Sequence, residues 1–402
     1  MAERKLRLGI AGLGRGFTVM LPTLAAHPCL QLVAAADPRA EGREKFAADF
    51  AARTYATVEE LCADRDVEAI YLATPHELHA AHVRIAAAAA KHVLVEKPMA
   101  ITLKDCSEMI AAARQANVRL VVGHSHSFNA PIRRARDIIV SGAVGRVRMI
   151  TAMNFTDFLY RPRRPEELVT EKGGGVVFSQ AAHQIDIVRL LGGGRVKSVR
   201  AQTGAWDPKR PTEGAYQAFL TFEDGACASA IYSGYGHFDS DEFCGWIGEL
   251  GRAKDPQDYG RARRLLETAA TPEGEAVLKA ARNYGGDAER TATRAPGALS
   301  HQHFGLIVAS CERADLRPLP NGVMVYDDST ARLDPLPAPG VPRAEVIDEL
   351  YDAVVFGRAP LHSGEWALGT VEVCLAILQS AREQREVSVK HQIGAQQTGL
   401  PE

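Results

Sequence analysis

The feature that most constrains the fold is a glycine-rich turn, GIAGLGRGF, at residues 9–17. An apolar run at 6–12 leads into it, and residues 16–27 have the pattern of a helix. So tight a turn needs glycine, because a Cβ atom would prevent a positive φ angle or the close approach of a phosphate. The amides at the start of the helix would then bind that phosphate. The turn therefore predicts a strand–turn–helix unit that binds a dinucleotide.

Two details decide how well this turn matches the dinucleotide fingerprint. The fingerprint ends in a third glycine or alanine where helix and strand pack closely, but Phe17 stands there and Gly16 comes one position early. Asp37 ends the next apolar run, about twenty residues on, as the fingerprint requires. The cofactor-binding residues predicted from this unit are Gly12, Gly14, Arg15, Gly16, Phe17 and Asp37.

Asp37 also predicts which cofactor is bound. Its carboxylate can accept hydrogen bonds from both hydroxyls of an adenosine ribose and would repel a 2′-phosphate, which favours NAD over NADP. Arg39 is close enough in the sequence to leave some tolerance of NADP open. The alternative for Asp37 is an acidic helix cap at the strand end.

Strand and helix patterns alternate through the first 123 residues. This alternation predicts a six-stranded, doubly wound parallel sheet of the Rossmann type in a domain spanning 1–124. The clearest further strands are predicted at 30–36, 67–74, 92–95 and 119–123, and the helices at 40–52, 76–90 and 103–116.

The pattern changes after Ser125. Alternating segments separated by turns predict a C-terminal α+β domain, 125–390, with an open and mostly antiparallel sheet. Within it, 251–298 is charged and punctuated by glycine and proline, and we interpret it as an insertion that is a lid, an oligomer contact or an idle excursion. The strands are predicted at 147–155, 196–204, 215–222 and 226–233, a proline-rich connector at 333–342, and closing helices at 344–356 and 365–384.

Composition narrows the function classes. The net charge of −2 gives no global basic field that would recruit nucleic acid, and no stretch is long and apolar enough to span a membrane. The seven cysteines are scattered without a CxxC pair, and no secretory signal precedes the first strand, so we expect a cytoplasmic protein. The histidines lack the HExxH spacing, so no bound metal is predicted.

Three further motifs add a family to this interpretation. They are ATPHELH at 73–79, EKP at 96–98, and GGG at 173–175 followed by HQID at 183–186. In this order and spacing the chain resembles the glucose–fructose oxidoreductase, inositol dehydrogenase and MocA family over nearly its whole length. The resemblance implies an NAD-dependent dehydrogenase that forms homodimers or homotetramers through the open sheet. The further cofactor-binding residues that it implies are Thr74, Pro75, His79, Glu96 and Lys97.

The same resemblance implies catalytic roles for Lys97 and His183. Lys97 would take the proton of the substrate hydroxyl, because partial burial beside a cationic nicotinamide lowers a lysine pKa. His183 would bond to or protonate the reacting oxygen. The family usually has Asp four residues before this histidine, whereas here Ser179 stands there and cannot hold charge. Asp186 either orients His183 or serves the structure.

A basic loop, YRPRRP at 160–165, suggests the substrate class. Its arginines form either a preorganised anion clamp or a solvated basic loop. The segments 154–168 and 176–186 resemble members of the family that oxidise the cis-4,5-dihydrodiol of phthalate, a small anionic precursor of an aromatic product. The alternatives are a sugar or inositol dehydrogenase, or an NAD-binding protein without catalysis. The residues predicted to bind substrate are Tyr160, Arg161, Arg163, Arg164 and Ser179.

Overall fold

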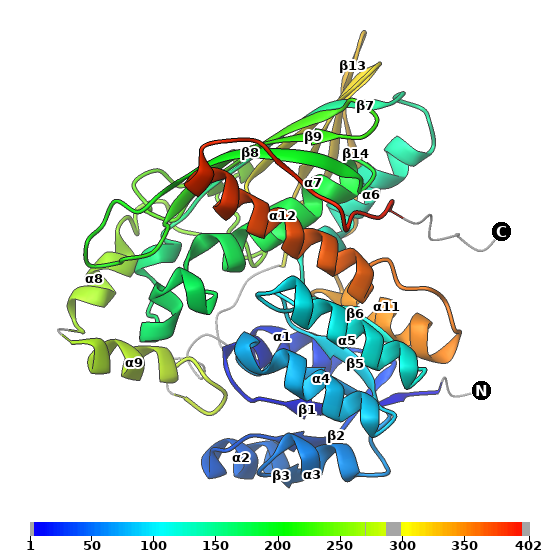
Figure 1. Cartoon of the computed structure of the whole chain (residues 1–402), viewed down its shortest axis with the longest axis vertical. Helices are drawn as coiled ribbons and strands as arrows, with labels where there is room; N and C mark the ends of the chain where they lie inside the picture. Colours follow the sequence, from blue (N-terminus) through cyan, green and yellow to red (C-terminus); the bar gives the residue numbers. More distant parts are fainter. Residues whose placement is uncertain (1–3, 270, 287–298, 396–402) are drawn as a thin grey trace.

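Two sheets organise the chain, and the computed structural model describes residues 4–269, 271–286 and 299–395 (Figure 1). The first sheet is parallel, with the order β3-β2-β1-β4-β5-β6 of a doubly wound Rossmann domain. Its strands are β1 Leu6–Ala11, β2 Leu30–Ala36, β3 Arg53–Tyr55, β4 Ala69–Leu72, β5 His92–Val95 and β6 Leu120–Val122. Its helices are α1 Arg15–Ala26, α2 Ala40–Phe50, α3 Val58–Ala63, α4 His79–Ala88 and α5 Leu103–Gln115.

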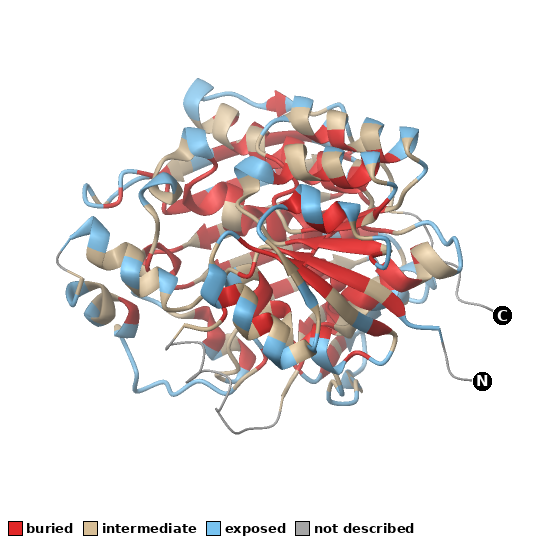
Figure 2. Cartoon of the chain, turned by 90° about the horizontal axis from the view of Figure 1, so that it is seen from below, coloured by how far each residue is buried: buried red, intermediate tan, exposed pale blue. Residues whose placement is uncertain are grey.

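Helices cover both faces of this sheet. Residues of α1, α2 and α11 share one core cluster with the strands, and residues of α3, α4, α5 and α12 share another. Figure 2 shows the strands buried between these layers. Since parallel strands align their carboxyl ends, the turns after β1, β2, β4 and β5 all open on one edge, where ligands of such sheets bind.

The second sheet is open, with the order β14-β13-β12-β11-β7-β10-β9-β8-β15. Strands β7 and β10 pair in parallel, and the other neighbouring strands in the described part of this sheet pair antiparallel. Its strands are β7 Val147–Phe155, β8 Val196–Gly204, β9 Ala215–Phe222, β10 Cys227–Ser233, β11 Leu306–Cys311, β12 Ala314–Leu319, β13 Gly322–Asp327, β14 Ala331–Pro335 and β15 Val387–Ser388. The remaining helices are α6 Ala130–Val140, α7 Ala182–Leu191, α8 Arg261–Glu267, α9 Pro272–Ala280, α11 Ala344–Val355 and α12 Gly364–Glu383.

One face of this second sheet packs on helices and the other is open. Helices α6, α7 and α12 contact its strands, and α12 also contacts α5 of the first domain. On the open side, Met149 and Phe219 are each 48% exposed. The N-terminal sheet ends with β6 and the second begins with β7, and we place the domain boundary at 124/125, between them.

The predicted fold class is confirmed, but several elements were not predicted, among them α6 and β15. The sequence analysis did not identify β3 and α3, which are short, nor the meander β11–β14, whose last strand runs into the predicted proline-rich connector. The predicted insertion forms α8 and α9 on the flank of the molecule (Figure 1); its residues 270 and 287–298 lie outside the described part. Within the described residues, no helix is long and apolar enough to cross a membrane.

Candidate active site

The glycine-rich turn has the geometry that a pyrophosphate requires. Gly12 has φ +92°, and a Cβ atom on it would lie 2.9 Å from the carbonyl oxygen of Ala73. Helix α1 begins directly after Gly14 with no acidic residue in its first turn and no side chain capping its amides. These amides therefore remain available to an anion, and the turn fits the phosphates of a dinucleotide.

Gly16 allows the close approach of helix and strand for which the dinucleotide fingerprint requires its third glycine. A Cβ atom on Gly16 would lie 3.4 Å from Cβ of Ala73 and 3.6 Å from Cγ of Glu96. We predicted that Phe17 contacts the cofactor, and for its side chain this prediction is wrong. The ring of Phe17 is fully buried and packs against Phe46, on the side of α1 that faces the core.

Asp37 is 5% exposed and is bonded to the turn itself. Its Oδ2 accepts a hydrogen bond from the amide of Leu13 (2.7 Å), and its Oδ1 accepts from the amide (2.9 Å) and Nε (3.0 Å) of Arg39. It does not cap α2, whose first turn takes no side-chain bond. Asp37 therefore fixes the turn from the end of β2, and Arg39 partly neutralises its charge.

His79 lies between the two loops of the cofactor edge. Its Nε2 is 3.0 Å from the carbonyl oxygen of Thr74, and its Nδ1 is 3.1 Å from that of Pro98. Burial lowers the pKa of His79 to about 4, so the ring is neutral. A neutral imidazole donates from only one nitrogen, so His79 hydrogen-bonds to one of these two carbonyl oxygens and contacts the other. Because both ring nitrogens face the backbone, we interpret His79 as a positioning residue rather than as the cofactor contact that we predicted.

Glu96 and Lys97 sit where the two domains meet. The hydroxyl of Tyr71 donates to Glu96, and burial raises the pKa of this carboxyl. Nζ of Lys97 donates a 2.7 Å hydrogen bond to the backbone carbonyl of Ser179, within the helical segment Val177–Ala181 that leads to α7. Burial lowers the pKa of Lys97 to about 8, which suits it to accept a proton near neutral pH.

His183 belongs to a cluster of three imidazoles. Its ring centroid is 4.8 Å from that of His126, 6.3 Å from that of His124 and 5.3 Å from that of Phe304. Burial and the nearby charge of Lys97 hold the pKa of His183 well below its usual range, so it is neutral. Its Nδ1 is buried and has no hydrogen-bond partner among the described residues.

Sequence reasoning missed His124 and His126, which it considered only as metal ligands. The amide of Asn129 lies between them: its Nδ2 donates to Nδ1 of His126 (2.9 Å), and its Oδ1 is 3.4 Å from Nε2 of His124. Neutral His124 therefore carries its proton on Nε2. His126 must accept at Nδ1, which leaves its own proton on Nε2. The signal for them in the sequence was the alternation HSH directly after β6, at the ligand-binding edge.

Ser179 and Asp186 do not join this cluster. The hydroxyl of Ser179 donates to the carbonyl oxygen of Gly175, within its own helical segment. Asp186 accepts from Ser127, from Nε1 of Trp366 (2.5 Å) and from the hydroxyl of Thr370 (2.9 Å). Of the two roles left open for Asp186, the structural one is therefore observed. Neither Ser179 nor Asp186 places a carboxylate against Lys97.

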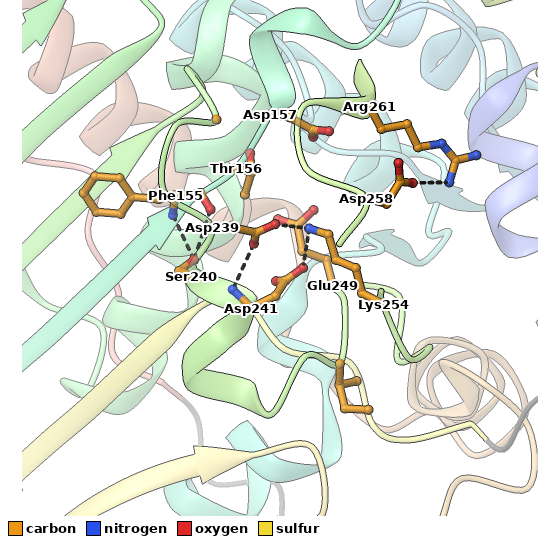
Figure 3. Close-up of polar contacts among 12 residues, drawn as sticks. Phe155, Thr156, Asp157, Asp239, Ser240, Asp241, Glu249, Lys254, Asp258 and Arg261 are labelled. Carbon is orange, nitrogen blue, oxygen red and sulfur yellow. Dashed lines mark hydrogen bonds and ion pairs between the residues drawn. The ribbon is translucent and has the colours of Figure 1, made fainter. Parts of the chain in front are cut away.

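The basic loop splits into one unpaired and two paired arginines. Arg161 donates to Asp157 (2.7 Å) and to Glu249 (3.4 Å), and these acids raise its pKa. Figure 3 shows these two acids beside the ion pairs that Lys254 makes with Asp239 and Asp241. Arg164 has longer contacts, 3.7 Å to Glu167 and 3.8 Å to Glu77, and the hydroxyl of Tyr160 is turned to Asp207.

Arg163 differs from its neighbours. Its guanidinium lies 3.6 Å above the ring of Phe158 and donates to the carbonyl oxygen of that residue (2.7 Å). It forms no ion pair with any described carboxylate. Burial lowers its pKa to about 10, and its charge also lowers the pKa of Lys97, so the two cations are near one another. Arg163 is thus a half-buried cation near Lys97. It has no carboxylate within salt-bridge distance among the described residues, although Glu167 lies within electrostatic reach of it.

Comparison with known proteins agrees with this geometry. Residues 6–124 match the model of an oxidoreductase family with an NAD-binding Rossmann fold, and residues 132–254 match the GFO/IDH/MocA C-terminal domain. The chain belongs to the Gfo/Idh/MocA oxidoreductase family. It is accordingly an NAD-binding dehydrogenase.

Three relatives place the chain within the Gfo/Idh/MocA family. A 1-carboxy-3-chloro-3,4-dihydroxycyclohexa-1,5-diene dehydrogenase of Comamonas testosteroni is 47% identical over 94% of this chain and 95% of its own. A candidate dehydrogenase of Bordetella bronchiseptica is 43% identical, with a TM-score of 0.90, over 96% of this chain and 100% of its own. The dehydrogenase WlbA of Bordetella pertussis, solved with NADH, shares the fold at 22% identity and a TM-score of 0.67, over 97% and 99% of the two chains.

Proposed function

We propose that this chain oxidises a cis-dihydrodiol bearing a ring carboxylate to the corresponding catechol, with NAD as acceptor. The member of this class that we propose is the cis-4,5-dihydrodiol of phthalate, which would give 4,5-dihydroxyphthalate. The observation that carries the proposal is Arg163, a half-buried guanidinium near Lys97 that has no carboxylate within salt-bridge distance among the described residues. A sugar or inositol would leave this charge without a counterpart, whereas a carboxylate satisfies it.

The residues of the site suit the two transfers that the reaction needs. Bound NAD would supply the acceptor for the hydride that leaves the carbon bearing the reacting hydroxyl. Neutral Lys97 takes the hydroxyl proton as the C–H bond breaks, so a carbonyl forms. His183, neutral and with its Nδ1 unpartnered, contacts the reacting oxygen. The hydroxyketone then tautomerises to the catechol: its neighbouring ring carbon loses a proton and the new carbonyl oxygen gains one.

This substrate class also accounts for Ser179. Restoring an aromatic ring makes the oxidation strongly downhill, so the proton on the hydroxyl can be taken by a single lysine. A sugar alcohol gains no such driving force and needs a stronger relay. The absence of a carboxylate at residue 179 is therefore tolerable for a dihydrodiol.

The Comamonas relative supports the class, because the compound in its name is itself a cyclohexadiene diol with one carboxylate. Phthalate dihydrodiol carries two adjacent carboxylates. Arg163 would bind one, and Arg164 is the nearest candidate for the second, because its own carboxylate contacts are long, at 3.7 and 3.8 Å.

The test is NADH formation by the purified protein with a graded set of substrates. The set is the cis-4,5-dihydrodiol of phthalate, a monocarboxylated cis-dihydrodiol, uncharged cis-benzene dihydrodiol, myo-inositol and glucose. We expect kcat/KM to fall in that order, with the uncharged diol at least tenfold below either acid. A preference for the monocarboxylate would correct the substrate and keep the class. Turnover of inositol or glucose alone would overturn the proposal.

We also propose that the protein acts as a cytoplasmic homodimer or homotetramer joined through the open face of the second sheet. Its support is the apolar area around Met149 and Phe219, each 48% exposed. Light scattering of the native chain and of Phe219→Glu tests it: the variant should be monomeric. An unchanged mass would overturn this interface.

A further inference from the structure

The chain after α9 returns to the glycine-rich turn of the first domain, although it lies outside both family models. The amide of Tyr284 donates to the carbonyl oxygen of Leu13 (3.1 Å). The hydroxyl of Thr18 donates to the backbone carbonyl oxygen of Arg282 (3.3 Å). Arg39, the partner of Asp37, reaches the carbonyl of Tyr284 at 3.5 Å. Residues 282–286 thus lie against the turn and the first turn of α1.

Tyr284 anchors this segment. It is 2% exposed and lies in the same core cluster as β1 and α1. Its ring meets that of Phe17 edge-on with centroids 5.1 Å apart, Nζ of Lys45 lies 4.9 Å over the ring, and its hydroxyl donates to Asp49. An aromatic side chain buried in this way holds the neighbouring backbone in one place. The anchor therefore fixes where Arg282 sits.

Arg282 and Arg15 form a pair of cations without an anion. Thr18 joins them: its hydroxyl bonds to the carbonyl of Arg15 (2.9 Å) as well as to that of Arg282. Neither guanidinium forms an ion pair with a described carboxylate, although Asp157 lies within electrostatic reach of Arg282. Partial loss of solvent and the charge of Arg282 lower the pKa of Arg15, although this residue is still exposed; partial burial and the charge of Arg161 lower the pKa of Arg282. Like charges gathered in this way become favourable only when an anion binds between them.

The NAD pyrophosphate is an anion that binds at such a place, the start of the first helix after the glycine-rich turn. We propose that Arg282 binds the cofactor pyrophosphate together with Arg15, so that the inserted segment completes the dinucleotide site and Tyr284 acts as its positioning residue. The insertion is then not an idle excursion. The proposal concerns cofactor binding alone and is independent of the substrate.

NADH binding to the purified chain, followed by fluorescence without substrate, tests this directly. Arg282→Ala should raise the Kd for NADH about tenfold, as expected for losing a charge-assisted bond of about 1.4 kcal/mol. The matched control is Arg264→Ala, also in the insertion, whose guanidinium forms an ion pair with Asp258 at 2.9 Å. The control should leave the Kd within twofold. A Kd within twofold in Arg282→Ala would overturn the proposal.

Displacement of NADH by ADP, AMP and adenosine locates the lost contact. The native chain should bind ADP more tightly than AMP, and Arg282→Ala should narrow that gap while leaving adenosine unchanged. An equal loss for all three ligands would mean that Arg282 acts on the fold of the turn and would overturn the pyrophosphate contact. Tyr284→Phe, which keeps the ring, should bind like the native chain, and Tyr284→Ala should match Arg282→Ala. If Tyr284→Ala does not fold, the Arg282 result decides alone.

Discussion

Lys97 donates its hydrogen bond to the backbone of Ser179, at the position where the family usually carries a carboxylate. A carbonyl dipole stabilises an ammonium ion far less than a carboxylate does. Burial therefore prevails, and the pKa of Lys97 falls to about 8. With serine at residue 179, a larger fraction of Lys97 is neutral and able to accept a proton at neutral pH. The site then lacks a second group that could hold that proton.

This relationship predicts the pH profile of the reaction. Lys97 accepts a proton only when neutral, so kcat/KM should rise with pH through about 8 and then level off. Ser179→Asp places a negative charge beside the ammonium, which favours the protonated form and raises its pKa. The rising limb of the profile should then move to higher pH by about one unit or more. If the pH profile of Ser179→Asp matched that of the native chain, Lys97 would not be the titrating base. Activity of a Lys97→Ala variant would lead to the same conclusion.

Arg163 is predicted to determine substrate affinity. Arg163→Gln removes the only unpaired guanidinium of the loop, so the KM for a carboxylated dihydrodiol should rise about 10- to 100-fold, or about 1.5–3 kcal/mol. The KM for NAD should not change. Arg164→Ala is the matched control for a monocarboxylated diol and should change its KM by less than threefold. Equal effects of the two variants would contradict the role assigned to Arg163.

Asp37 and Arg39 together predict cofactor preference. Asp37→Ser keeps an acceptor for the amide of Leu13 but removes the charge, which frees Arg39 to bind a 2′-phosphate. We expect kcat/KM with NAD to fall at least tenfold and kcat/KM with NADP to rise. Adding Arg39→Ala should abolish the gain with NADP. If NADP use is unaffected by the second change, Arg39 is not the residue that recognises the phosphate.

The sequence predicted local features better than long-range ones. Glycine spacing and apolar runs placed β1, α1 and Asp37, because backbone sterics act between near neighbours. Partners could not be read in this way. Three arginines in one loop look alike until the fold brings Asp157 and Glu249 to Arg161 and leaves Arg163 without a carboxylate. The role of Tyr284 as the anchor of the insertion could not be predicted for the same reason, because Tyr284 and Phe17 are in contact but far apart in the sequence.

Asn129 predicts a further effect on catalysis. Asn129→Leu preserves the size of the side chain but removes the contacts that fix the protons of His124 and His126. We expect kcat to fall about tenfold with the KM for NAD unchanged, because part of the population would hold the wrong tautomers beside His183. Nitrogen-15 shifts of the imidazoles should change from the Nε2–H form of His126 to a mixture of both tautomers.

Asn129→Asp separates this tautomer effect from loss of packing. A carboxylate can only accept, so Nδ1 of His126 must gain a proton to keep its bond, which raises the pKa of that imidazole. Below this raised pKa, a cationic His126 lies within electrostatic reach of Arg343 and Lys97 and disfavours a further positive charge at the site. Activity should therefore fall on the acid side more steeply than in the native chain and recover as His126 loses its proton. Equal loss at every pH, with native imidazole shifts, would mean that Asn129 contributes only to packing.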